Sequence, residues 1–352
     1  MNEKTMHAVV TTGHGGLERL EYREVEVPSP TEGEVLIKVS ACGLNNTDIW
    51  VREGAYGTDR DPDAVTGTGR VSHRFPLIQG GDVVGEIVGT GPGVAKQRLG
   101  QRVICNFMTY AQGPQGLEYS GSLGNSRPGG YAQYTTAPAE GVYETTSSHS
   151  DAELATLPCA YMTAQNMLDT ARVQAGETVL VTGASGGVGT ALIQLAHAMG
   201  ARVIAITSEK HGESLKSLNP HGIAYRDQDN LIDQVMSLCD ELGVDVVADV
   251  VAGKLFSQLL ACLKTKGRYV TAGAIGSAVV PFDVRTLYLK YLTFYGVSCG
   301  MPSHFEKVLR LLQEGSIKPL LHTTYPLAEI KQAQSHFISK DFFGNIAVEP
   351  GY

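Results

Sequence analysis

Residues 179–190 read Val-Leu-Val-Thr-Gly-Ala-Ser-Gly-Gly-Val-Gly-Thr, which is an apolar strand, a glycine-rich turn and the start of a helix. Ala184, Gly186 and Gly189 occupy the three small-residue positions of the G-x-G-x-x-G pattern, with alanine at the first. These positions let the chain turn tightly, let backbone amides approach a diphosphate and let the helix pack closely on the strand. Because free N–H groups and the helix dipole favour negative charge, the stretch predicts a dinucleotide site. Its predicted contacts are Ala184, Ser185, Gly186, Gly187, Val188 and Gly189.

The context of this turn strengthens the prediction, since 41 glycines in the chain would place some at any spacing. Residues 191–199 carry apolar side chains at helical spacing, Gly200 and Ala201 end that helix, and residues 202–207 form a second apolar run. A strand–helix–strand unit is therefore predicted around the turn.

The length of 352 residues favours two domains. The first part has short β-rich runs separated by glycine and proline, at 7–10, 34–39, 82–88 and 102–105. From about residue 151, helical segments alternate with apolar strands at 178–182, 203–206, 244–249, 267–271 and 292–295, which is typical of a doubly wound sheet. A helix at 304–314 and a strand at 344–348 are expected to return to the first domain. We therefore predict one domain from 1–150 and 299–352 and a second from 151–298.

Composition narrows the class of protein. The chain is 43% apolar and 18% charged, has no apolar tract of 18 residues and begins without a secretory apolar segment. We expect a cytoplasmic protein with no membrane partner. The net charge of −8 argues against general nucleic-acid binding. The six cysteines form no C-x-x-C pair, so neither a disulfide framework nor a zinc knuckle is indicated.

Several stretches together resemble the medium-chain dehydrogenase/reductase superfamily: 40–50, 75–85, 129–134, 157–164 and the glycine turn. The similarity covers nearly the whole chain and is nearest to the zinc-free quinone oxidoreductase-like branch of enone reductases. It implies an α/β fold, with a β-rich GroES-like catalytic domain and a Rossmann domain whose doubly wound parallel sheet binds the nucleotide.

The residues at the zinc-ligand positions of the zinc-dependent members of the superfamily favour the zinc-free branch. They correspond here to Asn45, Gly81 and Cys159. A catalytic zinc needs three protein ligands, and only Cys159 is one. The four closely spaced cysteines of a structural zinc lobe are also missing, since Cys105 is the only cysteine from residue 102 to 134. We expect no metal.

The end of the second nucleotide-domain strand indicates NADPH as cofactor. An acidic residue there would hold the ribose 2′-hydroxyl of NADH, but this strand ends in Thr207 and Ser208, followed by Glu209 and Lys210. Two hydroxyls and a lysine favour a 2′-phosphate instead. In the resembling reductases a lysine and a tyrosine grip that phosphate, and Lys210 and Tyr225 match them. Glu209 is an acidic residue close to this position, so NADH stays open as the alternative cofactor.

The resemblance also suggests catalytic residues. Asn45 matches an asparagine at the substrate site and is the first candidate to donate a hydrogen bond to the developing enolate oxygen; a turn-forming role is the alternative. Tyr56 matches a cleft tyrosine, either a proton donor or an aromatic wall. Asp48 is expected to hold loop geometry, with a general base as the weaker alternative. Trp50, where many relatives have tyrosine, indicates a hydrophobic small-molecule substrate.

The remaining site residues come from the resemblance alone. Thr163 is expected near the nicotinamide or the phosphates, while Gly273, Ala274 and Asn345 lie in segments expected to close over the nicotinamide. The apolar run 291–298 would pair two sheets in a homodimer, although a buried strand in a monomer gives the same pattern.

The sequence thus predicts a zinc-independent enzyme that transfers hydride from NADPH to a quinone or an α,β-unsaturated carbonyl compound. Three alternatives stay open: an enoyl-thioester reductase, an alcohol dehydrogenase-like enzyme and a non-catalytic NADPH-binding protein. The thioester reading needs a basic patch for a nucleotide-like tail, for which Arg52, Arg60, Arg70 and Arg74 are candidates unless they are simply solvated.

Overall fold

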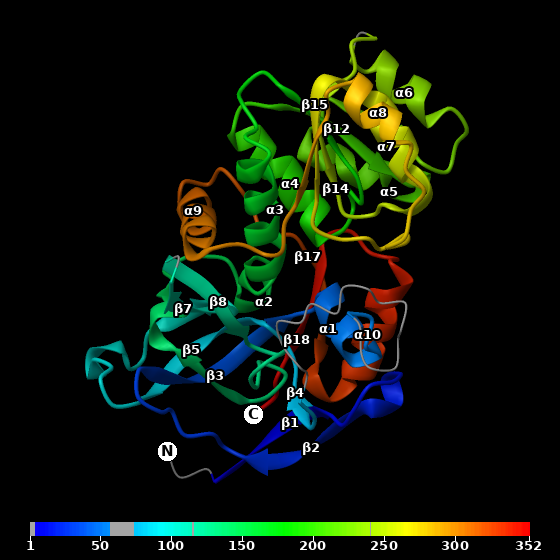
Figure 1. Ribbon diagram of the computed structural model, residues 1–352. Coiled ribbons are helices and arrows are strands. Elements are labelled where there is room, and N and C mark those ends of the chain that lie inside the picture. Colours follow the sequence, from blue (N-terminus) through cyan, green and yellow to red (C-terminus); the bar gives the residue numbers. More distant parts are fainter. Residues whose placement is uncertain (1–3, 57–73, 115, 240) are drawn as a thin grey trace. The chain divides into compact units, whose positions relative to one another are not determined.

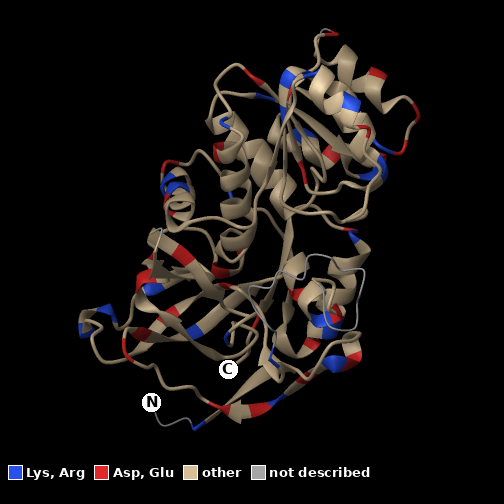
Figure 2. Cartoon of the chain, in the orientation of Figure 1, with Lys and Arg blue, Asp and Glu red and all other residues tan. Residues whose placement is uncertain are grey.

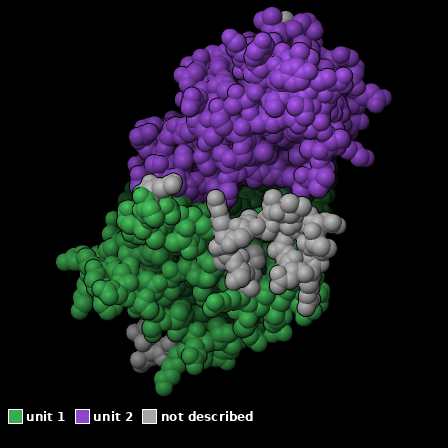
Figure 3. Space-filling view, in the orientation of Figure 1, with its two compact units in different colours: residues 1–159, 321–352 green, residues 160–320 purple. Residues whose placement is uncertain are grey.

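The computed structural model describes residues 4–56, 74–114, 116–239 and 241–352. The chain forms two compact units (Figure 3): unit 1 holds Met1–Cys159 and Leu321–Tyr352, and unit 2 holds Ala160–Leu320. The domain limits predicted above, 150/151 and 298/299, fall before these two divisions of the chain and stay a prediction. The predicted long loop at 57–72 lies outside the described residues.

Unit 1 is built on two sheets and a hairpin (Figure 1). The smaller sheet has the order β2-β1-β4, and the larger has the order β10-β6-β5-β3-β18-β17 with β9 also paired to β3. Strand pairing is antiparallel except between β17 and β18. The strands are β1 (Thr5–Thr11), β2 (Leu20–Glu26), β3 (Glu34–Gly43), β4 (Leu77–Ile78), β5 (Asp82–Thr90), β6 (Arg102–Cys105), β7 (Met108–Gly113), β8 (Gly116–Ser122), β9 (Tyr134–Pro138), β10 (Val142–Glu144), β17 (Leu321–Pro326) and β18 (Asn345–Glu349).

The helices of unit 1 lie beside the strand β3 and the C-terminal segment. They are α1 (Asn46–Glu53), α2 (Asp151–Leu154) and α10 (Ile330–Ser339). Ala347 and Val348 of β18 pair with Gly43 and Cys42 at the end of β3. The predicted return of the C-terminal strand to the first domain is therefore confirmed, and it brings the chain end next to the strand that leads into α1. The helix expected to return with it, α9 (Pro302–Gln313), belongs to unit 2 instead.

Unit 2 contains one sheet of six parallel strands in the order β13-β12-β11-β14-β15-β16. Strand order reverses between β11 and β14, and ligands of such sheets bind beyond the carboxyl ends of the strands at that point. The strands are β11 (Thr178–Val181), β12 (Arg202–Thr207), β13 (Gly222–Tyr225), β14 (Val244–Asp249), β15 (Leu263–Thr271) and β16 (Thr293–Gly296). The predicted doubly wound parallel sheet is confirmed.

The helices of unit 2 follow the alternation read from the sequence. They are α4 (Gly187–Ala198), α5 (Glu209–Leu215), α6 (Leu231–Ser237), α7 (Phe256–Cys262), α8 (Val284–Leu289) and α9 (Pro302–Gln313), together with most of α3 (Pro158–Thr170). Beneath α6 and α7 the core is aromatic: the Phe256 ring meets the rings of Tyr269 and Phe294 nearly edge-on, at centroid distances of 5.4 and 6.3 Å. Such pairs add specific geometry to apolar burial.

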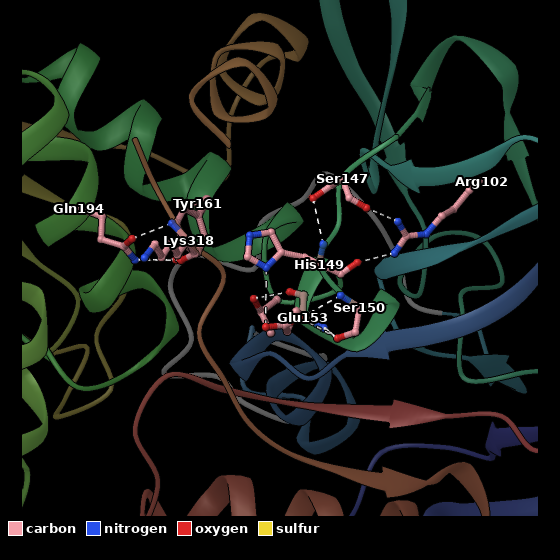
Figure 4. A network of polar contacts seen from close by, with 9 residues as sticks. Arg102, Ser147, His149, Ser150, Glu153, Tyr161, Gln194 and Lys318 are labelled. Atoms are coloured by element: carbon pink, nitrogen blue, oxygen red, sulfur yellow. Dashed lines mark hydrogen bonds and ion pairs between the residues drawn. The ribbon is translucent and has the colours of Figure 1, made fainter. Parts of the chain in front are cut away.

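Two polar networks fasten segments that lack regular structure (Figure 4). In unit 1, Arg102 of β6 donates to Asp151 Oδ1 and to the carbonyl oxygens of Ser147 and His149, each over 2.6 Å. In unit 2, Lys318 donates its N–H to Gln194 Oε1 over 2.8 Å and accepts from Tyr161 Oη over 2.5 Å. Each network satisfies backbone groups that no strand or helix would pair.

Positive and negative side chains are interspersed in both units (Figure 2). Within the described part of the chain, no helix is both long and apolar enough to span a bilayer.

Candidate functional site

The glycine turn follows β11 directly. The pattern predicted the tight turn at Ala184. In the structure Gly183, one residue earlier, takes the left-handed conformation, with φ +57°. Ala184 is buried with ordinary backbone geometry. A Cβ at Gly189 would collide with the carbonyl oxygen of Gly183, whereas one at Gly186 would meet nothing nearer than 3.6 Å. The absence of a side chain at Gly189 therefore lets α4 pack closely against the turn. Gly186, the N-cap of α4, leaves open space beside the free N–H groups at the start of the helix.

A buried carboxylate organises the neighbouring strand end. Asp249, the last residue of β14, accepts from Thr182 Oγ1 and Tyr269 Oη, each over 2.5 Å. It also accepts from the backbone N–H groups of Val251 and Ala252, at 2.8 and 3.0 Å. These four donors satisfy the buried carboxyl group and lock the loop beside the turn. The sequence reasoning missed Asp249, although an acid closing an apolar strand was a readable signal.

Ala252 sits in this loop with φ +52° and ψ −132°. That region is almost closed to residues with a Cβ, so the backbone there is strained by about 1–3 kcal/mol. The Asp249 hydrogen bond to its N–H holds the strained residue in place.

The residues predicted to bind the 2′-phosphate meet at the carboxyl ends of β12 and β13. Thr207 and Tyr225 are paired in register, and the ring of Tyr225 packs against Gly212 of α5. Thr207 is buried, and its hydroxyl has no hydrogen-bond partner among the described residues. A buried orphan hydroxyl is uncommon, and it marks this strand end as a place where a ligand would complete the bonding.

Lys210 lies exposed in the first turn of α5, close in sequence to that hydroxyl. Glu209 is engaged elsewhere: its N–H donates to Asp227 Oδ2 over 3.1 Å and its carboxylate accepts from Gln228 Nε2. Arg226, which the sequence reasoning did not select, donates its backbone N–H to the carbonyl oxygen of Thr207 over 2.9 Å, and its half-exposed guanidinium pairs with Asp227 over 3.6 Å. The cluster is therefore rich in donors.

The residues predicted to contact the nicotinamide lie in α3, after β15 and in β18. Thr163 is buried within α3, and Gly273 and Ala274 are half-buried after β15, where Gly273 accepts a bond from Thr271 Oγ1 over 3.1 Å. Asn345 belongs to unit 1, is buried, and uses its own Oδ1 to accept from the N–H of Ile346 over 3.0 Å. Their nucleotide contacts stay predictions.

In unit 1, Asn45 is held by two aspartates. It is the N-cap of α1, and its N–H donates to Asp48 Oδ2 over 2.9 Å, which satisfies one of the free donors at a helix start. Its side-chain Nδ2 donates to Asp82 Oδ2 over 3.0 Å, while Asp82 Oδ1 accepts from the N–H of Cys159 over 3.0 Å. The amide is therefore oriented by a carboxylate that is itself fixed at both oxygens.

Asp48 is fully buried and fixed from other sides too. Tyr131 Oη donates to its Oδ2 over 2.8 Å, and Gln79 Nε2 donates to its backbone carbonyl over 2.9 Å. Burial raises the pKa of Asp48 from 3.8 to about 6, although the hydrogen bonds from Asn45 and Tyr131 oppose the rise. These contacts fix the start of α1, and the role of Asp48 in holding loop geometry stays a prediction.

Tyr56 and Trp50 share one side of α1. Tyr56 Oη and Thr47 Oγ1 are 3.1 Å apart and hydrogen-bonded, and the rings of Trp50 and Tyr56 meet edge-on with centroids 5.6 Å apart. All three side chains are half-buried. Thr47, which the sequence reasoning overlooked, thus forms a pair of hydroxyls with the predicted tyrosine.

One proposed basic residue is not available. Arg52 was grouped with the loop arginines, but it belongs to α1 and its side chain is only 1% exposed. Its guanidinium donates to Gln334 Oε1 over 3.1 Å and to the carbonyl oxygen of Gly15 over 2.5 Å. Its part in a basic patch is therefore wrong, because a guanidinium satisfied by internal acceptors ties α1 to α10 instead. Arg74 is exposed, and Arg60 and Arg70 lie outside the described residues.

The residues at the zinc positions do not fit a catalytic metal. Gly81 has no side chain, and Asn45 commits its amide to Asp82, so Cys159 is the one thiol or imidazole of the set. Among the described residues, no group of three or more His, Cys, Asp and Glu side chains is placed to hold a metal ion. Where a structural lobe would lie, the hairpin β7–β8 is closed by backbone pairing.

Comparisons with known proteins give a consistent result. Residues 31–147 match the family model described as alcohol dehydrogenase GroES-like domain, and residues 187–314 match the one described as zinc-binding dehydrogenase. A curated relative, quinone oxidoreductase of Rattus norvegicus, is 32% identical over 96% of this chain and 95% of its own length. Another, acryloyl-coenzyme A reductase of Metallosphaera sedula, is 30% identical over 97% and 99%. A crystal structure of a putative alcohol dehydrogenase from Sinorhizobium meliloti is 48% identical and covers 99% of this chain and 98% of its own, with a TM-score of 0.93.

Proposed function

Because this chain belongs to the medium-chain dehydrogenase/reductase superfamily, we propose that it reduces quinones or α,β-unsaturated carbonyl compounds with NADPH and without a metal. The chain is an oxidoreductase of this superfamily, whose members use a nicotinamide cofactor. NADPH, the acceptor class and metal independence are the proposal. The observation that carries it is the Asn45 amide, aligned by Asp82 at a position where zinc enzymes have a metal ligand.

The preference for NADPH rests on the cluster at the end of β12. The buried, unpartnered hydroxyl of Thr207, the neighbouring Ser208, and Lys210 and Tyr225 offer donors and positive charge to a 2′-phosphate. A carboxylate at Thr207 would repel that phosphate. Of the two acids beside this strand end, Glu209 accepts from Gln228 and Asp227 accepts from the N–H of Glu209. Gly186 and the start of α4 would take the diphosphate.

In the proposed reaction, NADPH supplies a hydride when bound, and the protein must stabilise the negative charge that develops on the substrate oxygen. Asn45 has one amide hydrogen bound to Asp82 and a second for the substrate oxygen. Asp48 and Tyr131 are positioning residues that hold the N-cap at Asn45. The hydroxyls of Thr47 and Tyr56 provide further donors, and the ring of Trp50 supplies an apolar surface for a hydrophobic substrate.

A homodimer formed through β16 is part of the proposal. This strand is at the edge of the six-stranded sheet, and apolar side chains around it are exposed: Leu289 by 66%, Tyr291 by 70% and Tyr288 by 58%. An unpaired edge flanked by such side chains is typical of an interaction surface.

Steady-state assays would test the function. The purified protein is offered NADPH or NADH with quinones, enones and enoyl thioesters, the last because one relative is named as an acryloyl-coenzyme A reductase. We expect NADPH oxidation with at least one acceptor class, unchanged after chelation, in protein with far less than one zinc per chain by mass spectrometry. Nucleotide binding with no turnover on any acceptor would indicate a non-catalytic protein, and activity lost on chelation and restored by zinc would overturn metal independence.

A further inference from the structure

Arg226 follows β13 directly and lies at the strand end where the 2′-phosphate is proposed to bind. Its backbone N–H donates to the carbonyl oxygen of Thr207 over 2.9 Å, which continues the register that pairs Thr207 with Tyr225. Thr207 is buried, and its hydroxyl has no hydrogen-bond partner among the described residues. The backbone of Arg226 is therefore fixed beside a buried hydroxyl whose bonding a ligand would complete.

A carboxylate fixes the position of the Arg226 guanidinium. The guanidinium Nε is 3.6 Å from Asp227 Oδ1, and Asp227 Oδ2 accepts from the backbone N–H of Glu209 over 3.1 Å. The same carboxylate thus contacts both the guanidinium and the backbone that follows β12. The positive charge of Arg226 therefore lies beside residues 207–210, which hold the proposed phosphate contacts of β12.

The guanidinium is held only loosely by this carboxylate. A separation of 3.6 Å is too long for a hydrogen bond, and within the described part of the chain no hydrogen bond engages the side chain of Arg226. Arg268 of the same unit differs, since it donates to the carbonyl oxygens of Ala171 and Arg172 over 2.7 and 2.8 Å. The N–H groups of the Arg226 guanidinium are therefore available to a ligand.

A phosphate would bind this guanidinium better than Asp227 does. The side chains of Arg226 and Asp227 are 44% and 48% exposed. Exposed ion pairs contribute little to stability, because water screens them and both side chains lose freedom. A guanidinium binds a phosphate through two parallel charge-assisted hydrogen bonds, which are stronger. A phosphate at this strand end can therefore take the guanidinium from Asp227.

The local balance of charge makes this arginine decisive. Two acids, Glu209 and Asp227, and two cations, Lys210 and Arg226, follow the ends of β12 and β13. Their formal charges cancel, whereas without Arg226 the two acids would outnumber the one remaining cation. Since a phosphate monoester carries close to two negative charges at neutral pH, a site with a net negative charge would repel it.

We propose that Arg226 selects NADPH over NADH, because its guanidinium exchanges Asp227 for the 2′-phosphate. This inference rests on the NADPH preference proposed above and adds a second cation to it. The planar fork of an arginine matches the oxygens of a phosphate, whereas NADH offers a neutral hydroxyl at the same place. Asp227 competes with the phosphate for Arg226 and repels it, so this acid limits the preference that the arginine creates.

Calorimetric titration of the purified protein tests the inference without requiring turnover. The two ligands are adenosine 2′,5′-bisphosphate and AMP, which lacks the 2′-phosphate, and the wild type should bind the bisphosphate more tightly. Arg226→Gln should weaken binding of the bisphosphate about tenfold or more and leave AMP unchanged, because a hydrogen bond to a charged group is lost. Arg226→Lys should recover part of the loss, since an ammonium keeps the charge but not the fork.

Two further variants complete the comparison. Asp227→Asn keeps an oxygen for the N–H of Glu209 but removes the competing charge, so it should bind the bisphosphate more tightly and AMP as before. Arg23→Gln is the matched control and should bind both ligands as wild type does. Arg23 lies on β2 in unit 1, is 46% exposed and pairs with Glu21 in the same way that Arg226 pairs with Asp227.

Thermal unfolding midpoints and kcat/KM for NADPH and NADH are measured on the same variants. Loss of the bisphosphate alone, with an unchanged midpoint, supports the inference. An Arg226→Gln variant that keeps its affinity for the bisphosphate, or loses both ligands equally, overturns it and leaves the NADPH preference to Thr207 and Lys210. A wild type that binds both ligands equally overturns the NADPH preference and this inference together. Discrimination as expected, with no turnover of any acceptor, overturns the proposed reaction and supports the role of Arg226.

Discussion

The hydroxyl of Tyr131 donates to the carboxylate of Asp48 over 2.8 Å, and both side chains are buried in unit 1. Burial raises the pKa of Asp48 to about 6 despite this bond. The folded protein therefore binds the proton more tightly than the unfolded chain does, and stability falls as pH rises from about 4 to 6. The shift from 3.8 corresponds to about 3 kcal/mol, a cost that is complete above pH 6 and absent below pH 4.

We predict that Asp48→Asn removes this pH dependence, since an amide does not ionise and its oxygen can still accept from Tyr131. Unfolding midpoints of wild type and variant, measured at half-unit intervals from pH 4 to 8, should diverge between pH 4 and 6 in favour of the variant and then run parallel. Tyr131→Phe should move the wild-type window upward, because the ionised carboxylate loses a donor. Parallel curves throughout would contradict the assignment to Asp48.

A second prediction concerns the amide of Asn45. Asn45→Ala removes the donor aligned by Asp82, and we expect kcat to fall by roughly 100- to 1000-fold, as for other oxyanion donors. Loss of the N-cap residue should cost about 1 kcal/mol of stability. Asn45→Ser keeps a cap but not the amide, so it should recover the stability and not the rate. A kcat within threefold of wild type in Asn45→Ala would show that the amide is structural.

Parts of the site that are local in sequence could be predicted, and parts assembled from distant segments could not. The glycine turn could be predicted because strand, turn and helix are local, with the whole pattern inside twelve residues. The groups that orient Asn45 could not: Asp82 lies 37 positions away and Tyr131 83 positions from Asp48, and only sheet pairing brings them together. Arg52 was misread for the same reason, because its acceptor Gln334 is 282 positions distant.

A third prediction addresses the choice of cofactor. Lys210→Ala removes a positive charge from the end of β12, and kcat/KM for NADPH should fall about tenfold or more, since a hydrogen bond to a charged group contributes about 1.5–3 kcal/mol. The value for NADH should not change, because NADH lacks the 2′-phosphate. Lys331→Ala, an exposed lysine of α10 in unit 1, serves as control. Equal losses with both cofactors would remove Lys210 from the phosphate site.

A fourth prediction uses the strained loop beside the glycine turn. Glycine accepts the φ of +52° and ψ of −132° found at Ala252, so Ala252→Gly should stabilise the protein by about 1 kcal/mol after the greater freedom of the unfolded glycine is allowed for. Ala196→Gly, inside α4, is the opposite control and should destabilise by about 1 kcal/mol. Denaturant midpoints measure both. Destabilisation by Ala252→Gly would mean that the Asp249 hydrogen bond does not hold a strained residue.

The last prediction concerns the exposed apolar side chains near β16. If two sheets join through this edge, the double variant Leu289→Asp and Tyr291→Asp places four carboxylates at one two-fold interface, and like charges there repel. Sedimentation velocity should show a wild-type dimer and a monomeric variant, both with unchanged NADPH affinity. Leu242→Asp is the control, because Leu242 is equally exposed, at 71%, before β14 and away from the edge strand in the sheet order. A monomeric wild type, or a variant that stays dimeric, would place the apolar side chains outside any interface between copies.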